Sequence, residues 1–263
     1  MAIKGGVRTL GGVSDLLNHP LIAGRYFFPG GRPPTSRVDI RVDGAVVACG
    51  IHRVDPDGFT VVHFHGNGEV VADWQGVLDR AINRMGWDLL LAECRGYGGS
   101  TGEPLLGRML DDVGAVIAAA GPPEKLVVMG RSVGSFFALE AVSRFPNIAG
   151  LILESAIADP MERILLRVTP SELGGSRADV AALEARLDHR AKIGGFRGPT
   201  LILHTRFDGV VDVSHARRLK QWAGGDTTLR VFDEGDHNTI LWENTDDYLT
   251  AVADLLTTVR ARR

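Results

Sequence analysis

The chain alternates short runs of apolar and β-branched residues with longer segments of helical periodicity, and this rhythm constrains its fold more than any other feature. A strand, a helix and a second strand in succession favour a mostly parallel sheet covered by helices. The first two runs are joined by Asp43-Gly44, a dipeptide typical of an antiparallel hairpin. We therefore predict an α/β fold whose mostly parallel sheet has eight strands, at residues 37–42, 45–53, 59–64, 88–92, 125–129, 148–153, 200–204 and 229–232.

Helices are expected to flank this sheet at residues 70–85, 108–120, 133–145 and 248–260. Between residues 156 and 198 the rhythm of strands stops, and Asp159-Pro160-Met161-Glu162 predicts a helix with an Asp cap and a proline in its first turn. A second helix is expected after Ser176. Apolar residues at helical spacing would share one face of each helix: Met161, Ile164, Leu165 and Val168 in the first, and Val180, Leu183 and Leu187 in the second. We interpret residues 156–198 as a small helical cap inserted in a single domain of residues 1–263; a decorated crossover is the alternative.

Bulk composition narrows the class of protein. A chain of 263 residues, of which 44% are hydrophobic and 23% charged, can bury a large core. The formal net charge is −3 and the basic residues are not clustered, so no nucleic-acid partner is expected. The amino-terminal residues lack the apolar stretch of a signal peptide, and no segment approaches the roughly 20 apolar residues of a membrane helix. We expect a cytoplasmic protein without stable membrane insertion, in which Cys49 and Cys94 are reduced thiols.

The pattern Gly-x-Ser-x-Gly occurs twice, at residues 98–102 and 130–134. The second copy directly follows the fifth expected strand and directly precedes a segment of helical periodicity. A nucleophilic serine is typically carried on such a strand–turn–helix, where the turn is so sharp that positions near the serine need glycine. The first copy is preceded by polar, glycine-rich sequence and followed by Glu103-Pro104, which indicates a loop. We therefore predict Ser132 as a nucleophile; a tight turn that merely needs small residues is the alternative.

A serine hydroxyl needs a base that removes its proton as it attacks. His237 lies in a polar loop after the last expected strand, and we predict it as this base. His65 is its main rival, but it ends the third expected strand and begins the Gly66-Asn67-Gly68 turn, which favours a role in holding that turn. His63 and His65 share one face of their strand, but no third metal ligand is evident, so neither a metal nor another cofactor is expected.

A catalytic histidine is normally oriented by a carboxylate. Asp208 follows the seventh expected strand after a short turn, at the edge of the sheet where the loops of parallel strands converge. We predict that Asp208 has this role. Two alternatives stay open: Asp212 lies further into the same loop, and Glu154 ends the sixth expected strand.

With these residues identified, the sequence resembles the α/β-hydrolase superfamily over about residues 59–237, which is most of the chain. The likeness is greatest to the branch of serine-aminopeptidase-like and acyl-protein-thioesterase-like hydrolases. The order Ser132, Asp208, His237 is the one that this superfamily uses. The matching segments are His65-Gly66-Asn67-Gly68, residues 95–102, residues 130–134, Glu154-Ser155, residues 204–208 and Gly235-Asp236-His237.

The resemblance implies an oxyanion hole formed by the backbone N–H groups of Asn67 and Val133. Val133 is also expected to begin a helix, where free N–H groups and the helix dipole favour negative charge. The chain departs from the family around Asp208: relatives usually have His-Gly before this residue, but here Thr205-Arg206-Phe207 follows the histidine, and Asp212 stands where proline is common. These departures change the shape of the loop but keep the carboxylate.

The candidate residues and the resemblance together predict a carboxylesterase-like serine hydrolase, which cleaves an ester or thioester of a small molecule through an acyl-enzyme intermediate. An amidase or peptidase with the same residues is an alternative within catalysis. A non-catalytic protein that binds small molecules on the same fold is the alternative outside it, because fold does not guarantee activity. A nucleotide-binding α/β enzyme is disfavoured, because His65-Gly66-Asn67-Gly68 lacks the required glycine spacing.

Overall fold

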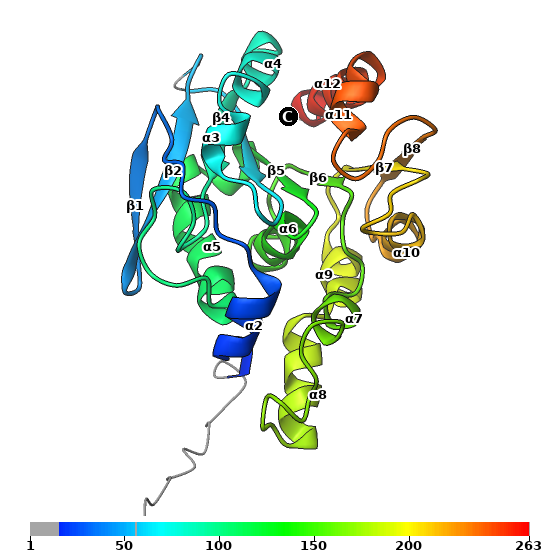
Figure 1. Cartoon of the computed structure of the whole chain (residues 1–263). Helices are drawn as coiled ribbons and strands as arrows, with labels where there is room; N and C mark the ends of the chain where they lie inside the picture. Colours follow the sequence, from blue (N-terminus) through cyan, green and yellow to red (C-terminus); the bar gives the residue numbers. More distant parts are fainter. Residues whose placement is uncertain (1–15, 56, 263) are drawn as a thin grey trace, which may run out of the picture.

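The computed structural model describes residues 16–55 and 57–262, so the amino-terminal residues in which we expected no signal peptide lie outside it. Its centre is an eight-stranded sheet in the order β1-β2-β4-β3-β5-β6-β7-β8, shown in Figure 1. Every expected strand is present, with bounds within two residues of those expected. The strands are β1 Val38–Val42, β2 Ala45–His52, β3 Thr60–Phe64, β4 Asp88–Ala92, β5 Leu126–Arg131, β6 Gly150–Glu154, β7 Thr200–Thr205 and β8 Thr227–Phe232.

The sheet is mostly parallel, as expected. β1 and β2 form the antiparallel hairpin around Asp43-Gly44, and β2 also pairs antiparallel with β4. The remaining pairs, from β4 through β3, β5, β6 and β7 to β8, are all parallel. The carboxyl ends of these parallel strands therefore meet at one edge of the sheet, where loops from different strands can bring side chains together.

Helices cover both faces of the sheet, because successive strand residues point to opposite sides. In β5, Val127 and Met129 pack on one face and Val128 on the other. The helices on the first face are α3 Val71–Trp74, α4 Leu78–Arg84, α11 Ile240–Glu243 and α12 Thr245–Ala261. Those on the second face are α2 Pro20–Tyr26, α5 Leu106–Ala120, α6 Gly134–Arg144, α9 His189–Gly195 and α10 Ser214–Trp222. Figure 1 shows α4 and α12 on one side of the strands and α5, α6 and α10 on the other.

Some helices differ from the expectation. The single helix expected at residues 70–85 is divided into α3 and α4, because Gly76 between them has φ +85°, a backbone conformation that a helix does not allow. The helices α2, α10 and α11 were not predicted. α10 shows why: only Ala216, Leu219 and His215 of its nine residues are buried, so its apolar stripe is short and interrupted by basic residues.

The segment between β6 and β7 contains three helices rather than the two expected. α7 (Pro160–Leu165) begins as predicted, with the Asp159 side chain accepting a hydrogen bond from the backbone N–H of Glu162. α7 ends at Leu165, before Val168, the last residue of its expected apolar face. Leu165, which was expected on that face, is 38% exposed. α8 (Arg177–Arg186) begins after Ser176 as expected, and the unpredicted α9 completes the segment. Figure 1 shows α7 and α8 beside α2, beyond the body of the sheet.

No helix in the described parts of the chain combines the length and the apolarity that crossing a bilayer needs. Cys49 and Cys94 are both free; the former is buried and the latter half-buried.

Candidate active site

Ser132 lies on the turn between β5 and α6, in the strand–turn–helix setting that the sequence predicts. Its φ of +51° is in the left-handed region, which is unusual for a residue with a side chain. The turn brings backbone very close: a Cβ atom at Gly134 would overlap the carbonyl oxygen of Phe64, and one at Gly130 would lie 2.7 Å from Cβ of Ala138. The two glycines are therefore required by packing, and the strained turn places the Ser132 side chain at the carboxyl edge of the sheet, beside the pocket.

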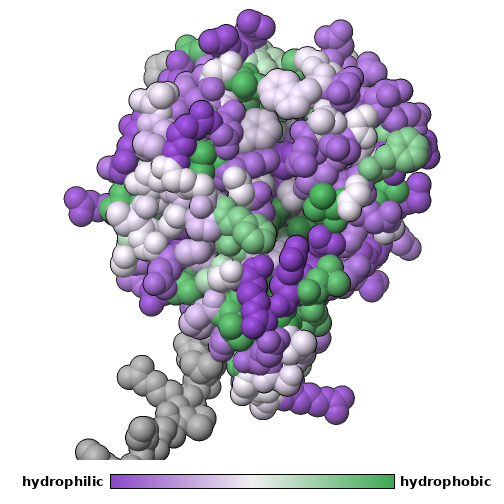
Figure 2. Space-filling view, in the orientation of Figure 1, coloured by the Kyte–Doolittle hydropathy of each residue, from purple (hydrophilic) through white to green (hydrophobic). Residues whose placement is uncertain are grey.

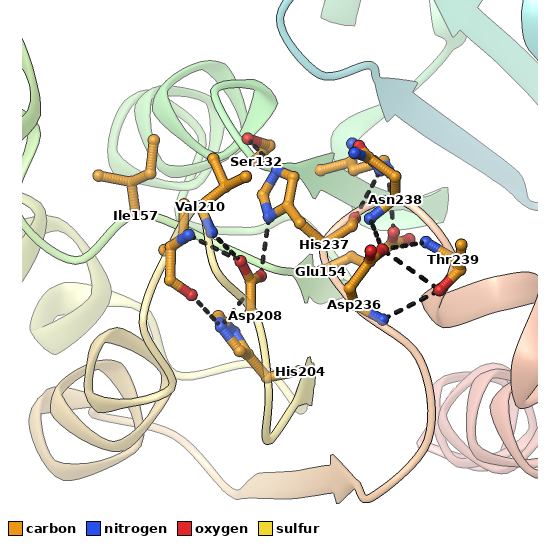
Figure 3. A network of polar contacts seen from close by, with 12 residues as sticks. Ser132, Glu154, Ile157, His204, Asp208, Val210, Asp236, His237, Asn238 and Thr239 are labelled. Atoms are coloured by element: carbon orange, nitrogen blue, oxygen red, sulfur yellow. Dashed lines mark hydrogen bonds and ion pairs between the residues drawn. The ribbon is translucent and has the colours of Figure 1, made fainter.

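The three predicted residues of the site lie in direct contact, as Figure 3 shows. His237 lies after β8 and Asp208 after β7, and both side chains are buried. The distance from His237 Nε2 to Ser132 Oγ is 3.0 Å, and that from His237 Nδ1 to Asp208 Oδ2 is 2.7 Å. Because a carboxylate can only accept, Nδ1 carries the hydrogen, and Nε2 is left to accept from the serine hydroxyl. This arrangement can deprotonate the hydroxyl as it attacks.

Asp208 is held as an anion. Its Oδ1 accepts hydrogen bonds from the backbone N–H groups of Val210 at 2.9 Å and Val211 at 2.7 Å. Burial tends to raise the pKa of Asp208, but the hydrogen bond and charge of His237 and these two N–H groups outweigh it, so the pKa is below its usual value. The carboxylate therefore remains charged at neutral pH, where it can stabilise an imidazolium.

The rival residues have other partners. Glu154 Oε1 pairs with Arg131 Nε at 3.0 Å, and its other oxygen accepts from the hydroxyl of Tyr248. Asp212 is exposed and accepts from the backbone N–H of Ser214 at 2.9 Å. Neither carboxylate is bonded to His237.

The rival base is also engaged elsewhere. His65 Nε2 contacts Glu93 Oε1 at 2.7 Å, and its Nδ1 contacts the carbonyl oxygen of Gly66 at 2.8 Å, so His65 holds the turn as predicted. His63, on β3, packs against the ring of Trp74, whereas His65 directly follows this strand. Among the residues searched, no group of three or more His, Cys, Asp or Glu side chains could hold a metal ion.

Arg131, directly before Ser132, is a part of the site that the sequence analysis missed. Its buried guanidinium donates to the carbonyl oxygen of His237 at 2.8 Å and also pairs with Glu69 at 2.6 Å and with Glu154 at 3.0 Å. The strand that carries the serine thereby fixes the backbone of the histidine loop. A charged residue at the end of an otherwise apolar buried strand was the available signal, because a charge is buried only where partners compensate it.

Asn67 and Val133, the residues expected to form an oxyanion hole, both line the pocket that contains Ser132. The Asn67 side chain is engaged elsewhere: its Oδ1 accepts from the backbone N–H of Phe28 and from the hydroxyl of Tyr97, each at 3.0 Å. Val133 is the cap residue of α6. Within the described residues, no acceptor is bonded to the backbone N–H of either Asn67 or Val133, so both can serve a ligand.

The pocket beside Ser132 has a volume of about 480 Å³, which suits a small organic molecule. Its lining comes from α2 and the residues after it, from the turn that carries Ser132, and from the loops that follow β7 and β8. Residues 157–167, called here the α7 segment, complete the wall. Apolar surface is supplied by Tyr26, Phe28, Ile157, Leu166 and Val210. The α7 segment therefore contributes directly to the wall of the pocket.

Comparison with known proteins agrees with this architecture. The family described as "alpha/beta hydrolase fold" matches residues 60–173. The uncharacterized protein YfhR of Escherichia coli is 24% identical over 211 residues, 77% of this chain and 71% of that protein. The human alpha/beta hydrolase domain-containing protein 17B is 25% identical over 182 residues, 67% of this chain and 59% of that protein.

Solved structures show the same fold at low identity. An esterase of Pyrococcus furiosus aligns with a TM-score of 0.67 at 17% identity, over 88% of this chain and 98% of that one. The esterase RhEst1 of a Rhodococcus species aligns with a TM-score of 0.63 at 18% identity, over 86% of this chain and 100% of that one. The strand order, the helices on both faces and these similarities show that the chain has the α/β-hydrolase fold.

Proposed function

We propose that this protein is a serine hydrolase that cleaves carboxylic esters or thioesters of small molecules, with Ser132 as nucleophile, His237 as general base and Asp208 as the carboxylate that orients the base. One observation carries the proposal: two consecutive hydrogen bonds, of 3.0 Å and 2.7 Å, join the serine oxygen through the imidazole to a buried carboxylate. The esterases among the similar structures support an ester as the substrate.

The reaction would proceed in two halves. As Ser132 Oγ attacks the carbonyl carbon, its proton passes to His237 Nε2, and the carbonyl oxygen becomes an oxyanion. The imidazolium then gives the proton to the departing alcohol or thiol, which leaves an acyl-serine. Water loses a proton to His237 as it attacks this ester, and the collapse of the second oxyanion returns the proton to Ser132 and releases the acid.

The oxyanion would be held by the backbone N–H groups of Asn67 and Val133. Donors of this kind are typically worth ~10²–10³ in rate each, because they already point at the place where negative charge develops. The position of Val133 at the start of α6 supports the assignment, since the helix dipole adds to the donor.

We also propose that residues 156–198 act as a cap over this site. The support is that Ile157 and Leu166 of this segment line the pocket together with Ser132. A wall of this kind limits the access of water and selects substrates by shape and charge.

A panel of p-nitrophenyl esters of increasing acyl length, tested on the wild type and on Ser132→Ala, tests the proposal. The wild type should hydrolyse the esters, and Ser132→Ala should lose about 10⁶-fold in kcat, because a triad without its nucleophile has almost no residual activity. The temperature of unfolding serves as the control, since the variant should keep its fold. Activity of Ser132→Ala within tenfold of the wild type would refute the proposal.

A further inference from the structure

The pocket beside Ser132 has a pronounced imbalance of charge. Its lining includes the arginines Arg131, Arg163 and Arg167, but no aspartate or glutamate among the described residues. Arg131 is compensated by its ion pairs with Glu69 and Glu154. The two arginines of the α7 segment therefore determine the charge that a bound molecule meets.

The carboxylates nearest in sequence to these two arginines are bound to other cations. Glu162 pairs with Arg218 on α10 at 3.0 Å, and Glu172 pairs with Arg25 on α2 at 2.7 Å. Within the described residues, neither Arg163 nor Arg167 makes an ion pair. Figure 2 shows strongly hydrophilic side chains beside hydrophobic ones on the face between α2 and α7. Two positive charges thus remain uncompensated at the pocket.

Tyr26 also lines the pocket and lies within electrostatic reach of both arginines. Burial raises the pKa of the Tyr26 hydroxyl, and the positive charges of Arg163 and Arg167 partly oppose this effect. Both guanidinium groups are therefore close enough to act on a single group in the pocket wall. Such a pair can act on one bound anion in the same way.

We propose that the substrate is an ester that carries a carboxylate or phosphate group a few bonds away from the scissile carbonyl, and that Arg163 and Arg167 select it. This inference rests on the proposed function. A guanidinium donates two parallel N–H groups that match the oxygens of a carboxylate or phosphate, which makes arginine the usual side chain for recognising them. Phe28, Ile157 and Val210 would then contact the short apolar linker between the charge and the carbonyl.

The first experiment compares p-nitrophenyl valerate with mono-p-nitrophenyl glutarate, two esters of equal acyl length that differ in the terminal group. The wild type should prefer the glutarate in kcat/KM by about 10–100-fold, the range expected for hydrogen bonds to a charged group. Arg163→Gln/Arg167→Gln should lose this preference, so that the ratio of its kcat/KM values for the two esters approaches one. The preference should also fall as salt is raised, because ions screen exposed charges.

Arg177→Gln is the matched control, because Arg177 is exposed at the start of α8, also within residues 156–198, but does not line the pocket. It changes the net charge by the same amount per substitution and should keep the preference for the glutarate. Equal use of the two esters by the wild type, or an unchanged preference in the double variant, would overturn the inference while the proposed function stands. Absence of Ser132-dependent turnover of either ester would refute the proposed function instead.

Binding to Ser132→Ala tests the inference without turnover. Titration calorimetry with ethyl valerate, monoethyl glutarate and 2-acetoxyethyl phosphate separates a neutral ester from a carboxylate and from a phosphate. At least one anionic ester should bind about tenfold or more tightly than the neutral ester, and the advantage should disappear when Arg163 and Arg167 are also replaced by glutamine. The anion that binds more tightly identifies the charged group; equal binding of all three would contradict the inference.

Discussion

The two copies of Gly-x-Ser-x-Gly share a pattern but have different structures. At residues 98–102 the chain forms a loop after β4, in which Ser100 Oγ accepts a hydrogen bond from the backbone N–H of Ala48 at 2.9 Å. At residues 130–134 the chain turns from a buried strand into a helix, and the serine oxygen contacts His237 at 3.0 Å. Ser100 holds two segments together, and Ser132 has an imidazole beside it.

The glycines do not distinguish the two copies. A Cβ atom at Gly98 would overlap the carboxylate of Glu93, and one at Gly134 would overlap the carbonyl oxygen of Phe64. In both copies, therefore, neighbouring atoms approach the backbone so closely that only glycine fits. What separates Ser132 from Ser100 is the set of partners that other strands bring to it, and that set is not part of the pattern.

Asp208→Asn removes a partner that only the second copy has, and it should give the largest effect. An amide at this position favours the wrong tautomer of His237, so we expect a loss of about 10⁴-fold in kcat. Asp212→Asn is the control, because this exposed carboxylate lies on the same loop without bonding to the histidine. It should change kcat little. If Asp208→Asn lost less than tenfold in kcat, Glu154 would become the favoured carboxylate for orienting the histidine.

The dependence of activity on pH sharpens the same comparison. The pKa of Asp208 lies below its usual value near 3.8, so this carboxylate stays ionised between pH 5 and 8. A change of activity in that range would therefore not come from protonation of Asp208. A general base must be free to accept a proton, so we expect kcat/KM to fall as the solution is made acidic. A constant kcat/KM down to pH 4 would contradict a histidine base.

Ser100→Ala tests the first copy and should give the smallest effect. The substitution removes the acceptor of the Ala48 N–H, and a lost hydrogen bond of this kind costs about 0.5–1.5 kcal/mol of stability. The hydroxyl has no part in the proposed reaction, so kcat should remain within about twofold of the wild type. Denaturant unfolding and ester turnover measure the two quantities. If Ser100→Ala lost as much activity as Ser132→Ala, the assignment of a structural role to Ser100 would be wrong.

The sequence was most informative where the physical cause of a structure is local. The bounds of the central strands follow from short continuous runs of apolar and β-branched residues, because these strands are buried on both faces. The start of α7 follows from an Asp cap and a proline. Ser132 could be chosen because its neighbours predict a strand on one side and a helix on the other. The break at Gly76 was missed, because a single glycine within a helical pattern does not reveal whether its φ is positive.

His237 and Asp208 could also be predicted, because the carboxyl ends of parallel strands meet at one edge and so limit where partners of Ser132 can lie. The tertiary structure decided how these loops are held. Arg131 bonds to the backbone of a residue 106 positions away, and Glu162 and Glu172 pair with arginines on α10 and α2 rather than with Arg163 and Arg167. Such pairings depend on the distance between groups that are remote in sequence. The sequence alone therefore determined the fold class and the candidate residues of the site, whereas the charge of the pocket emerged only when distant elements packed together.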